Sequence, residues 1–223
     1  MKTAVFCDFD GTISKLDVGY NIFHHFSNGK NDLLLPDWKE GRLSTRDCLR
    51  MEAELVNASA DEILAFIDQF EIDPGFSDFV KLCHENNVPL SIVSDGLDFY
   101  IKHILAKYNF SHLNVVSNIG ILENNGISIK FPHDNISCKR CGICKGEKID
   151  FFTQNKSEEY RTIFVGDGYS DACAAKTADI LFAKKDLEEY CLKNNIAYYS
   201  YDTFEDVINQ IIEMGLLLPI DKI

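Results

Sequence analysis

Two aspartates stand two positions apart near the start of the chain, in the segment Val5-Phe6-Cys7-Asp8-Phe9-Asp10-Gly11-Thr12. Residues two apart on a strand point to the same face, so Asp8 and Asp10 converge if the strand ends just after Asp8. Open α/β sheets place their chemistry at the carboxyl ends of strands. Gly11 permits a sharp turn there, and Thr12 adds a hydroxyl. A lone pair of acids of this kind is also typical of a buried strand that ends in a polar turn.

Three later segments place similar groups where a strand ends or a helix begins. Pro89-Leu90-Ser91-Ile92-Val93-Ser94-Asp95-Gly96 ends in a hydroxyl and a glycine, and Lys145-Gly146-Glu147-Lys148 opens a helix. Thr162-Ile163-Phe164-Val165-Gly166-Asp167-Gly168-Tyr169-Ser170-Asp171 ends in two acids. Taken one at a time, these side chains also fit turn residues, helix caps or solvated charges. Together they supply, in chain order, two acids, a hydroxyl, a lysine and two more acids.

This order of motifs resembles the haloacid dehalogenase superfamily, whose four motifs are DxDGT, a Ser or Thr at a strand end, a Lys, and GDxxxD. The resemblance runs from about Lys2 to beyond Asp179. It implies a Mg²⁺-dependent phosphatase that hydrolyses the phosphate monoester of a small molecule. A dehalogenase would need only the nucleophile, whereas the second acid and the GDxxxD pair favour a phosphate substrate.

The resemblance also implies a role for each acid. Asp8 would be the nucleophile that forms an aspartyl-phosphate intermediate. Asp10 would act as general acid to the leaving alkoxide and then as general base for the attacking water. Mg²⁺ prefers oxygen ligands, and the Asp8 carboxylate, the Asp10 carbonyl and the Asp167 carboxylate would bind it. Asp171 would bind the ion directly or through water.

The remaining motif residues would hold the phosphate, whose charge calls for hydrogen-bond donors and cations. The Ser94 hydroxyl and the amides of Asp95 and Gly96 would hold a phosphate oxygen. Lys145 would supply the fixed cation. Lys148 competes for that role, and the position of Lys145 at the start of a helix favours Lys145.

A cysteine-rich loop precedes this lysine. Cys138, Cys141 and Cys144, with His133 nearby, supply four N and S donors, the number that a structural zinc ion takes. Reduced thiols in a tight loop and an iron–sulfur cluster are the alternatives. A zinc ion here would hold the backbone of Lys145. Four further cysteines lie in expected strands or helices and fit core positions: Cys7, Cys83, Cys173 and Cys191.

Composition narrows the class of protein. The chain has 223 residues, 46% hydrophobic and 26% charged, which is ordinary for a globular protein. Its 35 acidic and 22 basic residues give a net charge of −13, which argues against nucleic acid as a partner. No segment has the length of a membrane span and no signal peptide precedes the first motif, so we expect a cytoplasmic protein without a membrane partner. The sequence indicates no oligomeric state.

Strands and helices alternate after Pro74-Gly75, and this alternation predicts a Rossmann-like α/β core, a parallel sheet with helices on both faces. The expected strands after the first cover 90–93, 114–117, 162–165, 180–182 and 197–199. The expected helices cover 76–86, 97–108, 146–154, 170–177, 187–193 and 204–213. Residues 118–131 are the exception, because Glu123-Asn124-Asn125-Gly126 predicts a hairpin turn.

Residues 14–73 have apolar side chains at helical spacing instead, with helix starts at Ser44 and Ser59. We therefore expect a helical-bundle cap domain, 14–73, inserted into a core domain of residues 1–13 and 74–223. Such a cap could close over the acids.

The position of this insertion resembles the phosphoserine-phosphatase-like branch of the superfamily. Within that branch the chain is most similar to the group of 2-hydroxy-3-keto-5-methylthiopentenyl-1-phosphate phosphatases of methionine salvage. The residues that carry this similarity are Pro36-Asp37-Trp38, Gly41-Arg42-Leu43-Ser44, Arg50-Met51 and Pro132-His133. A phosphoserine phosphatase, and a non-catalytic regulatory protein that binds phosphate or metal, remain as alternatives.

Phosphoserine phosphatases grip their substrate with a Glu after DxD and an Arg of the cap. Here Asp17 stands nearest to that Glu and is one methylene shorter, and Arg46 or Arg50 would be the arginine. We expect these residues to contact the substrate. Tyr20, Trp38 and Met51 are further candidates, for which packing in the protein core is the alternative.

Overall fold

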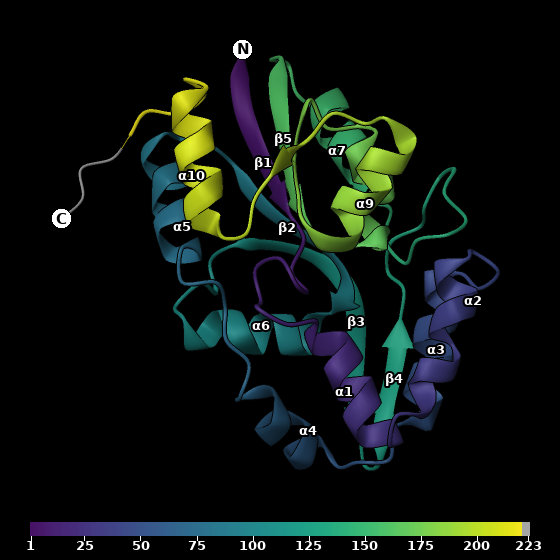
Figure 1. Ribbon diagram of the computed structural model, residues 1–223. Coiled ribbons are helices and arrows are strands. Elements are labelled where there is room, and N and C mark those ends of the chain that lie inside the picture. Colours follow the sequence, from purple (N-terminus) through teal and green to yellow (C-terminus); the bar gives the residue numbers. More distant parts are fainter. Residues whose placement is uncertain (220–223) are drawn as a thin grey trace.

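A seven-stranded sheet runs through the middle of the molecule in the computed structural model, which describes residues 1–219 (Figure 1). The strand order is β4-β3-β2-β1-β5-β6-β7, and every neighbouring pair is parallel except β3 and β4. The strands are β1 (Lys2–Cys7), β2 (Leu90–Leu97), β3 (Asn114–Glu123), β4 (Gly126–Lys130), β5 (Tyr160–Gly166), β6 (Ile180–Ala183) and β7 (Tyr199–Ser200). The predicted α/β fold with a largely parallel sheet is confirmed.

The sheet separates two apolar cores, because side chains along a strand alternate between its faces. Val5 and Cys7 of β1 are buried in one core, and Ala4 and Phe6 are buried in the other. The first core is covered by α5 (Phe76–Glu85), α6 (Asp98–Lys107) and α10 (Phe204–Glu213), and the second by α7 (Lys145–Gln154), α8 (Ala172–Ala175) and α9 (Lys185–Asn194). Helices therefore lie on both faces, as the sequence predicted.

The register of the central strands brings the predicted motifs to one edge of the sheet. Cys7, the last residue of β1, pairs with Ile92 of β2 and Val165 of β5. Asp8 therefore leaves the sheet at the same level as the residues that follow Ile92 and Val165. Parallel strands end at a common edge, so their loops meet there.

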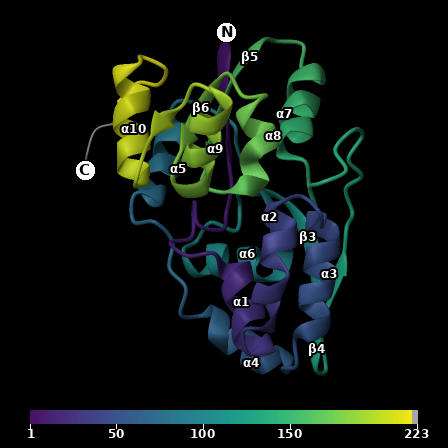
Figure 2. The ribbon, with the colours of Figure 1, turned by 45° about the vertical axis from the view of Figure 1, so that its right-hand side comes forward.

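A group of helices lies at the end of the molecule opposite the N-terminus (Figure 2). They are α1 (Val18–Ser27), a short 3-10 helix (Lys30–Leu33), α2 (Leu35–Lys39), α3 (Thr45–Leu55) and α4 (Ala60–Ile67). Ser44 begins α3 by accepting the N–H of Asp47, and Ser59 begins α4 in a capping box with Glu62. Each cap contributes about 1 kcal/mol, so both predicted helix starts have a local cause.

These cap helices also rest on the hairpin of β3 and β4. α3 packs against β4, with Ala53 and Val56 in the same apolar cluster as Ile127. The hairpin itself was predicted and is confirmed. Ser14 and Ile72 pair through a single bridge, so the segments that enter and leave the cap lie side by side. The domain division at residues 14 and 73 stays a prediction.

Two expected elements differ from the structure. The expected helix 170–177 is a short 3-10 turn followed by α8, because Asp171 turns its carboxylate back onto the N–H groups of Asp167 and Gly168. The last expected strand lies at Tyr199–Ser200. Within residues 1–219, no helix combines the length and apolar character needed to cross a membrane.

Candidate active site

The four predicted motifs meet at the carboxyl edge of the sheet. Lys145 Nζ lies 2.7 Å from Asp8 Oδ2 and 2.5 Å from Asp171 Oδ1. One carboxylate oxygen from each of Asp8, Asp167 and Asp171 lies within 4.8 Å of the other two. Groups from widely separated parts of the chain thus share one site, in the combination that the motif order predicted.

Peptide N–H groups hold these acids in place. Asp8 Oδ1 accepts the N–H of Phe9 at 2.7 Å, and Asp171 Oδ2 accepts the N–H of Asp167 at 3.0 Å. Gly11 has a φ of 71°, and a Cβ at this position would lie 2.2 Å from Asp167 Oδ2. Only glycine therefore fits the turn that follows the two aspartates.

The site carries more negative than positive charge. Burial lowers the pKa of Lys145, but the charges of Asp171 and Asp8 outweigh this effect and raise its pKa overall, so the lysine stays charged. Burial and the charge of Asp171 raise the pKa of Asp8 well above its usual range and also raise the pKa of Asp167. Three acids around one fully buried lysine leave an excess charge that a bound cation would neutralise.

Asp10 lies between the core and the first cap helix. Its Oδ1 accepts the N–H groups of Val18 and Gly19 at 2.9 and 3.2 Å. Its Oδ2 accepts the hydroxyls of Tyr100 at 2.7 Å and Ser94 at 3.5 Å. Burial raises the pKa of Asp10, even though the Tyr100 hydrogen bond lowers it. A raised pKa favours the protonated form, which a general acid needs.

Two side chains that the sequence analysis did not single out complete the site, Tyr100 and Lys185. Lys185 Nζ donates to Asp167 Oδ2 at 3.0 Å and to the backbone oxygen of Gly11 at 3.1 Å. Tyr100 holds Asp10. Both residues lie at the starts of helices that follow strands, α6 after β2 and α9 after β6. That position was the one signal in the sequence that could have indicated them.

A cavity of about 420 Å³ lies between this site and the cap. The core supplies its polar floor, which includes Asp8, Asp10 and Ser94. The cap supplies the opposite wall, which combines charged and polar side chains, Lys39, Thr45 and Glu52, with apolar ones, Phe23, Leu35, Trp38, Cys48 and Leu49. Asp17 and Tyr20, two predicted contacts, line the cavity as well, whereas Met51 is exposed to solvent. A cavity of this size holds a small organic molecule.

The chain matches the family model described as "Putative Phosphatase" over residues 3–206. The 2-hydroxy-3-keto-5-methylthiopentenyl-1-phosphate phosphatase of Lysinibacillus sphaericus is 31% identical over 237 residues, which cover 98% of this chain and 99% of that relative. The chain therefore belongs to the phosphatase family that this model describes. The protein of the same name from Bacillus thuringiensis is 31% identical over 211 residues, 93% of this chain and 94% of the relative.

Solved structures show the same fold. A structure described as a phospho-aspartyl intermediate analogue of phosphoserine phosphatase matches 96% of this chain and 98% of its own, with a TM-score of 0.72 and 17% identity. Phosphoserine phosphatase from T. onnurineus matches 95% of this chain and 94% of its own, with a TM-score of 0.68 and 17% identity. The phosphatase is a phosphoric monoester hydrolase with the fold of the haloacid dehalogenase superfamily, as the motifs predicted.

Neither of the two arginines predicted to contact the substrate is among the residues that line the cavity, and that contact stays a prediction. Arg46 donates to the backbone oxygen of Gly142 at 3.3 Å and to that of His133. Arg50 is exposed and lies 3.3 Å from Asp47, its ion-pair partner one turn away. Helical spacing placed both arginines on α3 correctly but did not show which side of the helix faces the cavity.

Asp95 turns its carboxylate away from the predicted phosphate position. Its Oδ1 accepts the N–H of Ile143, in the loop before Lys145. Burial raises the pKa of Asp95 to about 6, although the charge of Lys145 lowers it. The predicted contribution of Asp95 to phosphate binding therefore rests on its backbone amide. The N–H of Gly96 donates to Ser94 Oγ at 2.9 Å and keeps that hydroxyl in place.

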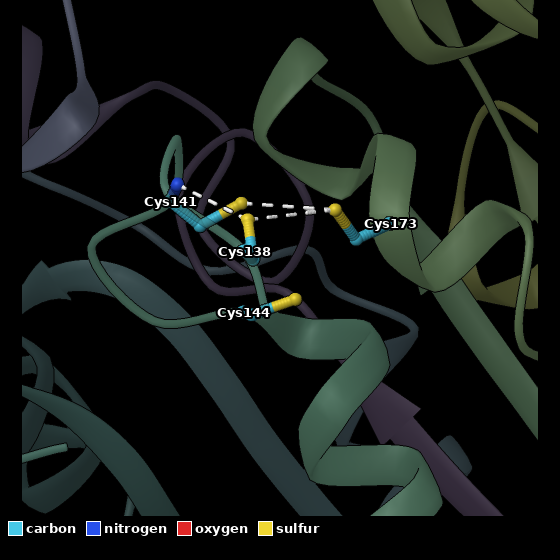
Figure 3. A group of neighbouring side chains, drawn as sticks. All are labelled: Cys138, Cys141, Cys144 and Cys173. Carbon is cyan, nitrogen blue, oxygen red and sulfur yellow. Dashed lines mark hydrogen bonds between the residues drawn. The ribbon is translucent and has the colours of Figure 1, made fainter. Parts of the chain in front are cut away.

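Cys173, and not His133, joins the cysteines of the loop (Figure 3). The Sγ atoms of Cys138, Cys141, Cys144 and Cys173 all lie within 4.8 Å of one another. His133 is not a member of this cluster, so its assignment as a zinc ligand is corrected. Cys173 was predicted as a core residue and is instead half-buried beside the loop, because α8 packs against α7.

Glu52 is an acid that the phosphatase buries in the cavity wall, and it should make stability depend on pH. Glu52 is only 6% exposed, and burial raises the pKa of its carboxyl group from 4.5 to about 7. A hydrogen bond from Asn31 lowers this pKa but does not outweigh burial. The folded state therefore holds this proton more tightly than the unfolded chain. The unfolding free energy should fall as pH rises from about 4.5 to about 7.

We expect Glu52→Gln to stabilise the fold at pH 8, by up to about 3 kcal/mol, and to change it little at pH 4.5 or below. Thermal unfolding monitored across this pH range measures the effect. Glu54→Gln, on the exposed side of the same helix, is the matched control and should leave the pH profile unchanged. Equal melting temperatures of Glu52→Gln and wild type at pH 8 would contradict the raised pKa.

Proposed function

We propose that this phosphatase hydrolyses 2-hydroxy-3-keto-5-methylthiopentenyl-1-phosphate, a phosphate ester of methionine salvage. The names of the relatives at 31% identity support this substrate. The observation that carries the proposal is the cavity, with the catalytic acids at one end and a cap wall at the other that includes the apolar side chains of Leu35, Trp38 and Leu49. Such a cavity matches a molecule with a phosphate at one end and a methylthio group at the other.

Asp8 and Asp10 carry the two chemical steps of the proposal. The Asp8 carboxylate attacks phosphorus, and the bond from phosphorus to the ester oxygen breaks as that oxygen takes the proton of Asp10. Asp10 then removes a proton from water, which attacks the aspartyl-phosphate, releases phosphate and restores Asp8. The Tyr100 hydroxyl and the amides of Val18 and Gly19 keep Asp10 oriented throughout.

The carboxylates at the carboxyl edge of the sheet fit Mg²⁺. Asp8, Asp167 and Asp171 offer oxygen atoms within 4.8 Å of one another, and Mg²⁺ is a hard cation that prefers carboxylate ligands. Burial, and after it the charge of Asp171, raise the pKa of both Asp8 and Asp167, and a bound cation would stabilise their ionised forms. When bound, Mg²⁺ would neutralise charge on the phosphoryl oxygens and on Asp8.

The phosphate itself would be held by Ser94 and by Lys145. Ser94 is buried at the cavity floor, and its hydroxyl lies 3.5 Å from Asp10 Oδ2. Lys145 is fixed by two carboxylates and presents a permanent positive charge beside the nucleophile. A fixed cation at this point stabilises the negative charge on the phosphoryl group during its transfer, and the lysine side chain does not have to move to do so.

The cap wall favours the methylthio compound over phosphoserine, the alternative substrate. A carboxylate and an ammonium group next to the ester would need partners of opposite charge in the cavity. Arg46 and Arg50, the arginines predicted to pair with that carboxylate, are not among the cavity-lining residues. The charged side chains that do line it include Lys39, Asp17 and Glu52. An uncharged methylthio group instead buries its surface against Leu35, Trp38 and Leu49.

Offering both substrates to the Mg²⁺-loaded enzyme tests this choice. We expect kcat/KM for the methylthiopentenyl phosphate to exceed that for phosphoserine by about 100-fold or more, since buried groups left without partners reject a wrong substrate strongly. Leu49→Asp should reduce that ratio by adding a charge to the wall. Equal or inverted values of kcat/KM would favour phosphoserine phosphatase instead.

A non-catalytic sensor of phosphate or metal is the alternative from another class of protein. Both aspartates of the DxDGT motif, the serine, the lysine and the GDxxxD acids are present and gathered, which speaks for catalysis. Hydrolysis of a generic aryl phosphate in the presence of Mg²⁺ decides between the two. Binding without turnover would indicate the sensor.

A second metal, Zn²⁺, belongs to the proposal as a structural ion. The cysteine cluster would hold it, and none of the four cysteines is among the residues that line the cavity. The ion would therefore supply no group to the reaction.

A further inference from the structure

The sulfur atoms of the four cysteines lie close enough together to bind a single metal ion. Cys173 Sγ lies 4.0 Å from Cys138 Sγ and 3.9 Å from Cys141 Sγ. Zinc binds thiolates at about 2.3 Å in a tetrahedron, and two such ligands are about 3.8 Å apart. A disulfide would need about 2.05 Å. These two separations lie close to the value that one zinc ion sets, and the other sulfur pairs are within 4.8 Å. Figure 3 shows Cys138 and Cys141 on one side of the cluster and Cys173 on the other.

The donor set is one that is common for structural zinc. Four thiolates are soft ligands, and a closed set of four cysteines is typical of structural zinc sites. An iron–sulfur cluster would bind its thiolates to two or more different irons and would hold them farther apart than a single ion does. The spacing of the sulfur atoms around a common centre therefore favours one ion.

The loop that carries three of the ligands is held in shape by groups around it. The Glu147 carboxylate accepts the N–H groups of Ile136, Ser137 and Cys138 at 2.6 to 2.9 Å. These bonds lower the pKa of Glu147 to about 2, against the effect of burial. The N–H of Cys141 donates to Cys138 Sγ at 3.5 Å. Such bonds orient metal ligands and are a common part of metal sites.

The cluster lies beside the catalytic pair of lysine and aspartate. Cys144 is the residue before Lys145, and Cys173 follows Asp171 by two positions. Lys145 Nζ and Asp171 Oδ1 are 2.5 Å apart. One ion bound to both cysteines would therefore tie the start of α7, which carries Lys145, to α8, which directly follows Asp171.

The same loop supports the cap. The N–H of Thr45 donates to the backbone oxygen of Arg140 at 2.8 Å, and the Arg140 side chain donates to the backbone oxygens of Trp38 and Lys39 at 3.1 and 3.2 Å. Arg140 stands between two of the cysteines in the sequence. A loop fixed by metal would hold α2 and α3 over the cavity.

We infer that Cys138, Cys141, Cys144 and Cys173 bind one Zn²⁺, which fixes Lys145 against Asp171 and holds the loop on which the cap rests. This inference rests on the proposed function in one respect, the catalytic role of Lys145. The metal content and the stability of the loop are independent of any substrate.

Metal analysis of the full chain, produced in zinc-supplemented medium, tests the site first. We expect about one zinc per chain in the wild type, and far less in Cys173→Ala. Cys83→Ala, in α5, is the matched control and should keep the metal. Cobalt(II) in place of zinc should give the absorption of a tetrahedral thiolate site in wild type and Cys83→Ala only. If Cys173→Ala does not fold, Cys138→Ala and the cobalt spectrum of the wild type give the same information.

Removal of zinc by a chelator, followed by readdition of Mg²⁺, tests the role of the ion. We expect kcat on an aryl phosphate to fall about 10-fold or more, the melting temperature to fall, and both to recover when zinc is restored. Wild-type protein without zinc and without a cobalt spectrum, or with iron instead, would overturn the zinc site. Zinc bound equally by Cys173→Ala would overturn the ligand set, and unchanged kcat after zinc removal would overturn its role. A protein that holds zinc but hydrolyses no phosphate ester would contradict the proposed function and leave the metal site standing.

Discussion

Asp8→Asn should lower kcat by about 10⁴-fold or more while leaving the fold intact. The amide oxygen that replaces Asp8 Oδ1 can still accept the N–H of Phe9, and Lys145 keeps its contact with Asp171. The folded state already disfavours a charge at this position, since burial and Asp171 raise the pKa of Asp8. Loss of that charge should therefore cost little stability, and the melting temperature should change by no more than about 4 °C.

Steady-state kinetics on an aryl phosphate and thermal unfolding measure the two effects. Asp150→Asn, an exposed site on α7, is the matched control and should have wild-type kcat. Rapidly quenched wild-type enzyme should carry a phosphoryl group on the peptide that contains Asp8, and the variant should not. A kcat of Asp8→Asn within tenfold of wild type would show that another group is the nucleophile.

The catalytic residues of the site were predictable because each of them follows a short local sequence pattern, and the parallel sheet then brings these segments together. Each apolar run that ends in a polar group predicts a strand and its carboxyl end. Parallel strands share one edge, so Asp8, Ser94 and Asp167 had to come together once the sheet was parallel. The pairing of Cys7 with Ile92 and Val165 is the register that this argument needs.

The cysteine cluster was only partly predictable, because one of its members comes from another element. Cys173 lies on α8, 29 positions after Cys144 (173 − 144), and reaches the loop through the packing of α7 on α8. Gly146 allows this approach, since a Cβ there would lie 2.8 Å from the backbone oxygen of Cys173. Sequence spacing favoured His133, which is nearer in the chain. Which of the two residues, His133 or Cys173, joins the cluster depends on tertiary contacts, and the sequence pattern does not show these contacts.

The cap shows the same limit. Its helices and their starts at Ser44 and Ser59 follow from capping residues and apolar spacing. The orientation of α3 does not, because it depends on where β4 and the cysteine loop lie. Arg46 is held by the backbone oxygens of that loop, and Glu52 is buried in the cavity wall. Side-chain roles across an interface between distant segments thus required the structure.

Lys145→Met should have the second large effect, and it should affect both stability and activity. The side chain is fully buried and its Nζ lies 2.7 Å from Asp8 and 2.5 Å from Asp171. Methionine fills a similar volume but leaves two buried carboxylates without their cation, a change that costs about 3–5 kcal/mol. We also expect kcat to fall about 10²- to 10³-fold, because the phosphoryl group loses a fixed positive charge.

The stability loss in Lys145→Met should itself depend on pH and on Mg²⁺. Without the lysine, the pKa of Asp8 rises further, so the unpaired carboxylate is costly where it is ionised and harmless where it is protonated. The melting temperatures of variant and wild type should therefore differ most at pH 8 and converge as pH falls. Mg²⁺ should restore part of the loss, because it compensates the same carboxylates.

Lys148→Met is the matched control, because Lys148 lies one turn farther along α7 and its side chain is half-buried. It should change the unfolding free energy by no more than about 0.5 kcal/mol and leave kcat close to wild type. The pair of variants thereby decides which of the two lysines serves the site. Loss of activity in Lys148→Met with activity retained in Lys145→Met would assign the role to Lys148 and would contradict the geometry in which Lys145 joins Asp8 to Asp171.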